Sequence, residues 1–229
     1  IFFVLNFRNI TLNLGLNFAE FLMEDHLSEE EIDQMIEFEG LKYLDQALKK
    51  DKGVIIYSAH LGNWELLGAV LASKGYKVHS IAQEQNNSLF DKKINQIRKN
   101  AGIGIIPKGF SIRKAFKVLK KNEILAILGD QHARNNGWEL SFFGRPALTF
   151  AGVVQFAQRT GAPIVPIFFH RRGWLKHKIK CYKPREIKAD ASEAELKSEL
   201  QSLVKLSEEE ISKAPADWMW LHKRWKNSN

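Results

Sequence analysis

The chain has 229 residues, 45% of them hydrophobic, and its 34 Lys and Arg against 26 Asp and Glu give a net charge of +8. This composition is typical of a globular domain, and the length suits one domain with an ample core. Only 6 Pro, 15 Gly and 1 Cys are present, which excludes collagen, low-complexity sequence, a disulfide framework and a multi-cysteine zinc site. The sequence pI near 9.5 leaves nucleic acid, a membrane surface and an anionic substrate as candidate partners.

The positive charge is concentrated in one segment. Residues 171–188 hold eight basic side chains and one acidic side chain, for a net charge of 8 − 1 = +7. The basic residues are Arg171, Arg172, Lys176, Lys178, Lys180, Lys183, Arg185 and Lys188. Such a patch favours contact with a polyanion or a membrane surface, and a solvated lysine-rich hairpin is the alternative. The acidic stretch 24–39 is expected to offset basic residues elsewhere.

The chain begins with Ile1 rather than Met, so we expect it to be a segment of a longer protein. Residues 1–23 predict an amphipathic helix, because apolar side chains recur at spacings of three and four. Arg8 and several asparagines interrupt the apolar pattern too early for a membrane span. We therefore expect this helix to pack on the core, with a position on a bilayer surface as the alternative.

From residue 28 onward, short apolar runs alternate with amphipathic segments. Ser28 and Glu31 form a capping-box pattern that opens a helix over 28–35. Buried strands are predicted over 54–59, 77–83, 103–107, 123–128, 163–169 and 177–182. Helices are predicted over 64–74, 89–100, 111–121, 152–159 and 192–212. Strands separated by helices imply βαβ units, so we expect a single α/β domain over residues 1–229, with a mainly parallel central sheet flanked by helices.

The most informative chemistry follows the strand over 54–59. His60 lies where this strand stops, Gly62 permits a tight turn, and Asn63 is a suitable N-cap for the next helix. A break in the chain between His60 and Glu65 can bring the carboxylate back toward the imidazole. A histidine oriented by a carboxylate is a general base, and the adjacent helix N-terminus can bind an oxyanion. A structural histidine at a strand end is the alternative.

Other reaction classes lack their signatures. The sequence contains no Gly-x-Ser-x-Gly elbow, no His or Cys pairs at metal-ligand spacing, and no glycine-rich phosphate loop. Cys181 lies in a basic strand with no catalytic pattern around it. We therefore expect no metal and no resident cofactor, with His60 acting directly on a substrate hydroxyl.

Four blocks carry a family resemblance. The stretch His60-Leu61-Gly62-Asn63-Trp64-Glu65 resembles the His-x4-Asp/Glu block of glycerolipid acyltransferases, in the form typical of the bacterial lipid A biosynthesis (late lauroyl/myristoyl) acyltransferase family. Gly129-Asp130-Gln131 resembles that family's Asp-Gln block after a strand. Residues 142–147 (Phe-Phe-Gly-Arg-Pro-Ala) with 160–163 (Thr-Gly-Ala-Pro) resemble its second conserved region, and residues 220–226 (Trp-Leu-His-Lys-Arg-Trp-Lys) resemble its C-terminal block. The blocks occur in the family's order, so they are more specific than one His-x4-Glu.

The resemblance implies a glycerolipid-acyltransferase-like fold and an O-acyltransferase. The acyl group would pass from a thioester of acyl carrier protein or acyl-CoA to a hydroxyl of a membrane glycolipid, foremost a lipid A precursor. The setting would be the cytoplasmic face of the inner membrane. His60 would be the general base, Glu65 would orient it, and backbone amides near Gly62 and Asn63 would hold the oxyanion.

The resemblance also implies substrate-binding residues away from His60. Asp130 is a candidate second carboxylate near His60, and Gln131 follows it in the same block. Arg145, Arg171 and Arg172 would face lipid phosphates or the acidic carrier protein.

The sequence leaves a second interpretation open for the acceptor lipid and for the class of protein. The family's arginine after the second strand is Gln83 here, so an acceptor such as a glycerolipid or a mannosyl lipid remains open. A basic nucleic-acid-binding domain and an inactive lipid-binding homologue also remain open, although residues 171–188 lack the interleaved aromatics of a stacking platform.

At the C-terminus, the spacing of Trp218, Leu221 and Trp225 predicts a packed helix, and an interfacial aromatic belt is the second interpretation of these residues.

Overall fold

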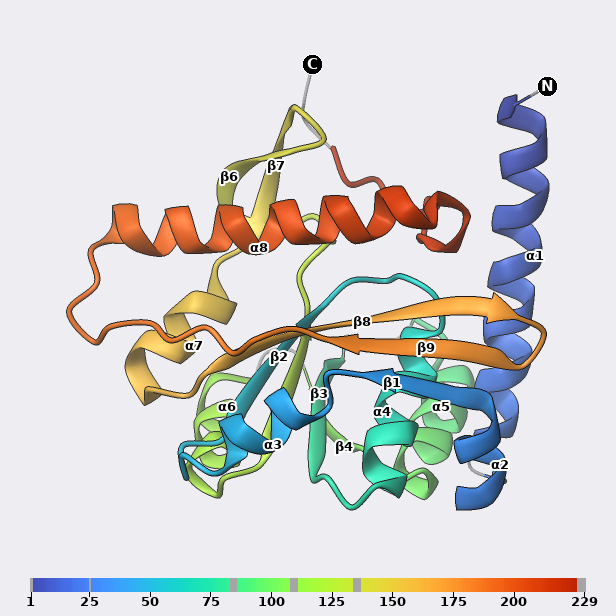
Figure 1. Cartoon of the computed structure of the whole chain (residues 1–229), viewed down its shortest axis with the longest axis horizontal. Helices are drawn as coiled ribbons and strands as arrows, with labels where there is room; N and C mark the ends of the chain where they lie inside the picture. The colour runs from blue at the N-terminus through green and yellow to red at the C-terminus, as the bar shows by residue number, and fades with distance from the viewer. Residues whose placement is uncertain (1, 25, 83–85, 108–110, 134–136, 226–229) are drawn as a thin grey trace.

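A seven-stranded sheet forms the centre of the molecule (Figure 1). The computed structural model describes residues 2–24, 26–82, 86–107, 111–133 and 137–225, with all side chains in these ranges except those of residues 2–6 and 111. The sheet order is β1-β9-β8-β2-β5-β3-β4. Its strands are β1 (Ile36–Glu39), β2 (Val54–Ser58), β3 (Val78–Ala82), β4 (Gly104–Pro107), β5 (Ile124–Leu128), β8 (Ile164–Gly173) and β9 (Lys176–Cys181). The five strands β8, β2, β5, β3 and β4 pair in parallel, whereas β9 runs antiparallel to β8. The expected α/β fold with a mainly parallel sheet is confirmed.

Apolar side chains cover the sheet on both faces. Every residue of β2 is buried, as expected for an apolar run in the middle of a parallel sheet. Because side chains alternate across a strand, Ile56 joins one apolar cluster and Tyr57 joins the other. The core is therefore two layers with the sheet between them.

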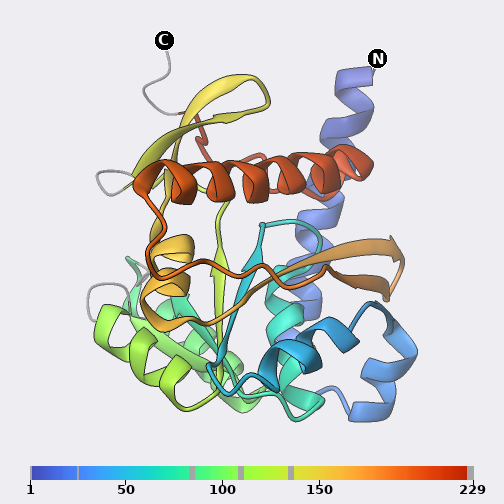
Figure 2. The same ribbon diagram turned by 60° about the vertical axis from the view of Figure 1, so that its left-hand side comes forward.

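The helices divide between these two layers. They are α1 (Phe2–Met23), α2 (Glu29–Met35), α3 (Lys42–Leu48), α4 (Trp64–Ser73), α5 (Ser88–Asn100), α6 (Ser111–Lys120), α7 (Gly152–Thr160) and α8 (Glu193–Lys213), followed by a 3-10 turn, η1 (Pro215–Asp217). Residues of α2, α3 and α4 enter the cluster of Ile56, whereas α6, α7 and α8 enter the cluster of Tyr57. A separate antiparallel hairpin of β6 (Gly137–Phe142) and β7 (Arg145–Phe150) lies beside α8 (Figures 1 and 2).

Helix ends follow the sequence signals. Ser28 and Ser192 each accept a hydrogen bond from the backbone N–H of the third helical residue, Glu31 or Glu195. The carboxylate of that residue accepts a hydrogen bond from the backbone N–H of the cap residue. Gly161 ends α7 in the left-handed conformation, with φ of 69°. These local interactions explain why the predicted boundaries of the long helices agree closely with the structure.

Some elements differ from the sequence predictions. Strand β1, helix α3 and the β6–β7 hairpin were not predicted, because each is short and takes its stability from neighbours distant in sequence. The predicted C-terminal helix is wrong: beyond η1 the described chain is irregular, and Leu221 is 67% exposed while Trp218 is buried. Gln83 lies outside the described residues.

Helix α1 stands along one side of the molecule, and its N-terminal half extends beyond the body (Figures 1 and 2). It confirms the helix predicted over residues 1–23. Among the described residues, no helix combines the length and the hydropathy that crossing a bilayer requires.

Candidate active site

His60 and Asp130 meet because they follow two paired strands at the same distance. Ser58, the last residue of β2, is in register with Leu128, the last residue of β5. Two residues further along, His60 and Asp130 lie side by side at the carboxyl edge of the sheet, where open α/β sheets bind their ligands. The His60 Nδ1 to Asp130 Oδ1 distance is 2.7 Å, and the His60 backbone N–H donates to Asp130 Oδ2 at 2.9 Å.

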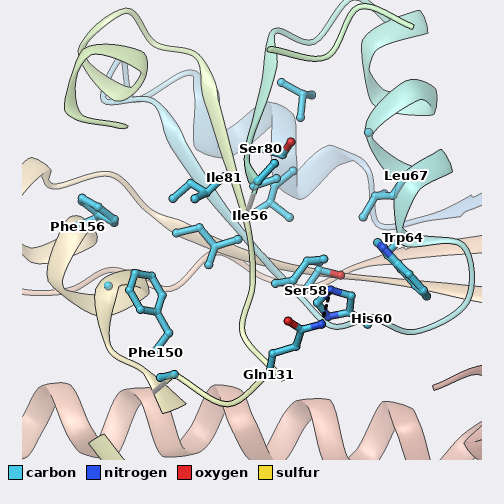
Figure 3. A pocket seen from close by; sticks show the side chains of 18 of the residues that line it. Ile56, Ser58, His60, Trp64, Leu67, Ser80, Ile81, Gln131, Phe150 and Phe156 are labelled. Atoms are coloured by element: carbon cyan, nitrogen blue, oxygen red, sulfur yellow. Dashed lines mark hydrogen bonds between the residues drawn. The ribbon is translucent and has the colours of Figure 1, made fainter. Parts of the chain in front are cut away.

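Asp130 is held as a carboxylate. Burial acts to raise its pKa, but the charge of His60 and hydrogen bonds from His60 and Trp218 outweigh that effect and lower the pKa. An ionised carboxylate only accepts hydrogen bonds, so in the neutral form of His60 the proton lies on Nδ1 and Nε2 presents a lone pair. The Gln131 side-chain amide donates to that Nε2 at 3.1 Å (Figure 3). His60 therefore has the tautomer that a general base needs.

The C-terminal segment completes this site, which the sequence analysis did not anticipate. Trp218 donates its indole N–H to Asp130 Oδ2 at 2.8 Å, and the Met219 N–H donates to the His60 carbonyl at 3.0 Å. Arg224 is fully buried and donates to the backbone carbonyls of Leu148 and Gln131, at 2.6 and 3.3 Å. The segment's partners lie more than 70 residues away in sequence, so spacing within the segment gave no signal of this role.

Glu65 does not orient His60, contrary to the sequence prediction. Its two carboxylate oxygens accept from Arg98 of α5, at 2.9 Å from Nε and 2.6 Å from Nη2. Asp130 takes the position at His60 Nδ1 instead. The geometry thus assigns the orienting role to the carboxylate that the sequence analysis ranked second.

Gly62 shapes the turn rather than offering its amide to a substrate, and the Asn63 side chain caps the helix that follows. The Gly62 N–H donates to the Asp217 carbonyl at 3.0 Å, which corrects the prediction that it would hold an oxyanion. Gly62 has φ of +57°, and a Cβ there would collide with the carbonyl of Phe169, so only glycine fits. Asn63 is buried, and its side-chain oxygen caps α4 through the Leu66 N–H.

The predicted phosphate-binding arginines lie elsewhere, and none of them lines the cavity around His60. Arg171 is buried, and its guanidinium donates to Glu20 and Asn17 of α1 at 2.7 Å. Arg172 is exposed on the β8–β9 hairpin. Arg145, in β7, stacks over the ring of Trp225 with its Cζ 5.3 Å from the ring centroid. The structure does not bring these side chains to His60.

Four of the eight basic side chains in residues 171–188 pair with carboxylates of the described residues, namely Arg171, Lys178, Lys180 and Arg185. Strand pairing places Glu37 opposite Lys178 and Glu39 opposite Lys180, and Lys178 lies 2.9 and 2.8 Å from the two carboxylates. The acidic stretch 24–39 offsets a basic residue elsewhere, as expected, because Glu29 and Asp33 pair with Lys74, and it also offsets this segment through Glu37 and Glu39. The positive charge of residues 171–188 that is free to meet a polyanion or a membrane surface is therefore smaller than the sequence predicts.

A large, mainly apolar cavity opens at His60. Its volume is about 1250 Å³, above the ~300–1,000 Å³ of usual small-molecule sites. In Figure 3, Trp64 and Leu67 of α4 lie on one side of His60 and Gln131, whereas Phe150 and Phe156 lie on the other. Side chains of both apolar layers thus line the cavity. Among the described residues, no group of three or more His, Cys, Asp or Glu side chains is arranged to hold a metal ion.

Comparison with known proteins matches most of the chain to a family. A family model described as bacterial lipid A biosynthesis acyltransferase matches residues 8–227. The chain belongs to this family. The match spans all four blocks that carried the resemblance in the sequence.

Individual relatives of the family are distant. The phosphatidylinositol mannoside acyltransferase of Mycobacterium tuberculosis H37Rv is 26% identical over 192 residues, covering 81% of this chain and 58% of that protein. The lipid A biosynthesis palmitoleoyltransferase of Escherichia coli K12 is 23% identical over 235 residues, covering 96% of this chain and 70% of that protein. The matched region is therefore little more than half of the mycobacterial relative.

A solved structure is also similar. The crystal structure of the 1-acyl-sn-glycerophosphate acyltransferase from Thermotoga maritima is 18% identical and has a TM-score of 0.49. The similarity covers 90% of this chain and 98% of that one.

Proposed function

We propose that this protein transfers a fatty acyl group from a thioester donor to a hydroxyl group of a membrane glycolipid. The observation that carries the proposal is the His60–Asp130 pair, 2.7 Å apart, with His60 Nε2 facing a mainly apolar cavity. Membership of the acyltransferase family supports the reaction class. The donor would be acyl carrier protein or acyl-CoA, with no metal or resident cofactor required.

The proposed reaction uses His60 as a proton carrier. Nε2 removes the proton of the acceptor hydroxyl as its oxygen attacks the thioester carbonyl carbon. The new C–O bond forms, the C–S bond breaks, and the thiolate takes the proton back from the imidazolium. Asp130 stabilises that imidazolium and fixes its tautomer. The product is an ester and a free thiol, so protons and electron pairs balance.

The position of Gln131 indicates where the acceptor would bind. Its amide donates to His60 Nε2 at 3.1 Å, which is the contact that the acceptor hydroxyl needs. The hydroxyl would displace this amide, leaving the Gln131 N–H groups next to the reacting atoms. The two apolar parts of the cavity would take the donor chain and an apolar portion of the acceptor.

For the acceptor we propose a lipid A precursor, because the family model and the Escherichia coli relative are named for lipid A biosynthesis. The resemblance to the mycobacterial protein supports a mannosylated phosphatidylinositol as the second candidate. In either case we propose that the enzyme works at the cytoplasmic face of the inner membrane. Acyl transfer from labelled acyl carrier protein or acyl-CoA to a panel of both lipids and a lysoglycerolipid distinguishes these acceptors.

Replacement of His60 tests the reaction itself. We expect His60→Ala to lower kcat by about 1,000-fold or more, since general-base catalysis contributes ~10²–10⁴-fold and the imidazole also protonates the leaving group. His60 is partly exposed at the cavity wall, so the thermal midpoint of unfolding should change little. Wild-type turnover by His60→Ala would refute the mechanism.

A further inference from the structure

Ser58, the last residue of β2, carries a hydroxyl group that has no hydrogen-bond partner among the described residues. Ser58 is only 2% exposed, so bulk water does not take the place of that partner. A buried polar group without a hydrogen bond is costly and uncommon in folded proteins. The stability of the fold therefore does not explain this hydroxyl.

The unpaired hydroxyl belongs to the wall of the His60 cavity. Ser58 is two residues before His60, so their Cα atoms are at most ~7 Å apart. Side chains two positions apart along an extended chain point to the same face of a sheet, and Figure 3 shows Ser58 next to the His60 ring. The hydroxyl is therefore close to the atoms that would react at His60 Nε2.

The strand pairing that brings Asp130 to His60 also fixes the backbone of Ser58. Ser58 is in register with Leu128 of β5, and its carbonyl accepts a hydrogen bond from the Gly129 N–H at 2.9 Å. Because the backbone is fixed, the hydroxyl moves mainly by rotation about χ1. A donor that is held in this way and is not hydrated can stabilise a developing charge without reorganisation of solvent.

The proposed reaction needs such a donor. When the acceptor oxygen adds to the thioester, the former carbonyl oxygen takes on negative charge. The Gly62 N–H, which the sequence suggested for this oxyanion, is already bonded to the Asp217 carbonyl. The Gln131 amide becomes available once the acceptor hydroxyl displaces it from His60 Nε2. A second donor near Nε2 would complete the oxyanion site.

We propose that the Ser58 hydroxyl donates a hydrogen bond to the oxyanion of the tetrahedral intermediate, together with the Gln131 side-chain amide. The proton stays on Ser58 Oγ throughout, so the acceptor's proton still moves through His60 to the thiolate. The oxyanion supplies the partner that the hydroxyl lacks in the free enzyme. This inference rests on the proposed function, since acyl transfer is the reaction that forms the oxyanion.

Two buried serines with opposite surroundings make a matched test. Ser207 of α8 is also fully buried, but its Oγ lies 3.0 Å from Tyr57 Oη and 3.3 Å from the Leu203 carbonyl oxygen. Ser58→Ala should lower kcat by about 100-fold or more, in line with the loss of one oxyanion donor. The KM values for donor and acceptor should not change, because the hydrogen bond forms only in the transition state and the intermediate. Ser207→Ala should leave kcat unchanged.

Thermal unfolding of the same two variants should give the reverse order. Ser58→Ala should not lower the melting temperature, since it removes a buried polar group that has no partner. Ser207→Ala should lower it by about 2–4 °C, because the Tyr57 hydroxyl loses its hydrogen bond. A slower enzyme that is no less stable is the signature of a catalytic hydroxyl rather than a structural one.

Three results would overturn the role of Ser58. They are wild-type kcat in Ser58→Ala, a raised KM for the acceptor with kcat unchanged, and a loss of kcat that accompanies a lower melting temperature. Acyl transfer by the wild-type protein is measured first. Its absence with every acceptor would refute the proposed function itself, which distinguishes that failure from each of the three.

Discussion

The turn after β2 and the basic β8–β9 hairpin are both prominent in the sequence, yet only the turn lies at the cavity. The turn brings His60 to Asp130 at the edge of the cavity. In the hairpin, Arg171, Lys178 and Lys180 are paired with carboxylates of α1 and β1. A motif formed by a strand end and a helix cap depends on residues close in sequence, so the sequence predicts it. Whether a charged side chain is free or paired depends on which strand lies beside it.

The first prediction distinguishes the roles of the two carboxylates near the turn, Asp130 and Glu65. Asp130→Asn should lower kcat/KM by about 1,000-fold or more, because an amide cannot stabilise the imidazolium and favours the wrong tautomer. Glu65→Gln should cost about tenfold or less, since Glu65 contacts Arg98 rather than His60. Steady-state kinetics on both variants decides the assignment, and an equal loss for Glu65→Gln would restore the role that the sequence suggested.

The second prediction concerns the hairpin, where adjacent arginines have opposite environments. Arg171→Gln should reduce the free energy of unfolding by about 3 kcal/mol or more, because it leaves the buried carboxylate of Glu20 without its main partner. Arg172→Gln should change it by less than about 0.5 kcal/mol, since Arg172 is exposed. Urea unfolding of both variants measures the difference, and similar midpoints would show that the Arg171 pair is not a structural contact.

The third prediction concerns the pKa of Glu20, the carboxylate that pairs with Arg171. Burial acts to raise the pKa of Glu20, but His177, whose Nε2 lies 3.3 Å from Glu20 Oε1, and hydrogen bonds from Arg171 and Asn63 outweigh it. They hold the pKa at about 2, against an ordinary value of 4.5. A lowered folded-state pKa contributes stability above pH 4.5, and that contribution is lost as the pH falls toward 2. It amounts to about 3 kcal/mol.

Urea unfolding between neutral and acid pH tests this dependence. The wild-type midpoint should fall steeply below about pH 4.5, and Glu20→Gln should flatten that fall while starting from a lower stability at neutral pH. Parallel pH profiles for the two proteins would contradict the assignment.

The smallest effect is expected at Trp218, which positions Asp130. Trp218→Phe removes the indole N–H that donates to Asp130 Oδ2 at 2.8 Å, and kcat should fall by about tenfold, in line with the loss of one charged hydrogen bond. Without that donor the carboxylate interacts more strongly with the imidazolium, so the acid limb of the kcat/KM profile should move to higher pH. A lower melting temperature with an unchanged pH profile would indicate a packing role alone.

Much of the fold was predictable because its signals are local. The buried run of β2, the capping boxes at Ser28 and Ser192, and the glycine that ends α7 each act within a few residues. Strand β1 and the β6–β7 hairpin were missed since their stability comes from pairing across the sheet or against α8. The C-terminal segment was assigned a helix from the spacing of its apolar residues, although Trp218 and Trp225 pack against Phe142, which is distant in sequence.

The sequence by itself determined the histidine that we propose as the general base, the glycine turn that carries it, the α/β fold and the family. Only the tertiary structure decided which carboxylate orients His60, because that depends on the register of β2 against β5. It also decided that Arg171 is a buried ion-pair partner and that the buried hydroxyl of Ser58 has no partner among the described residues. Hydrogen bonds and ion pairs act over a few ångströms, and neighbours at that distance come from chain segments that no local pattern connects.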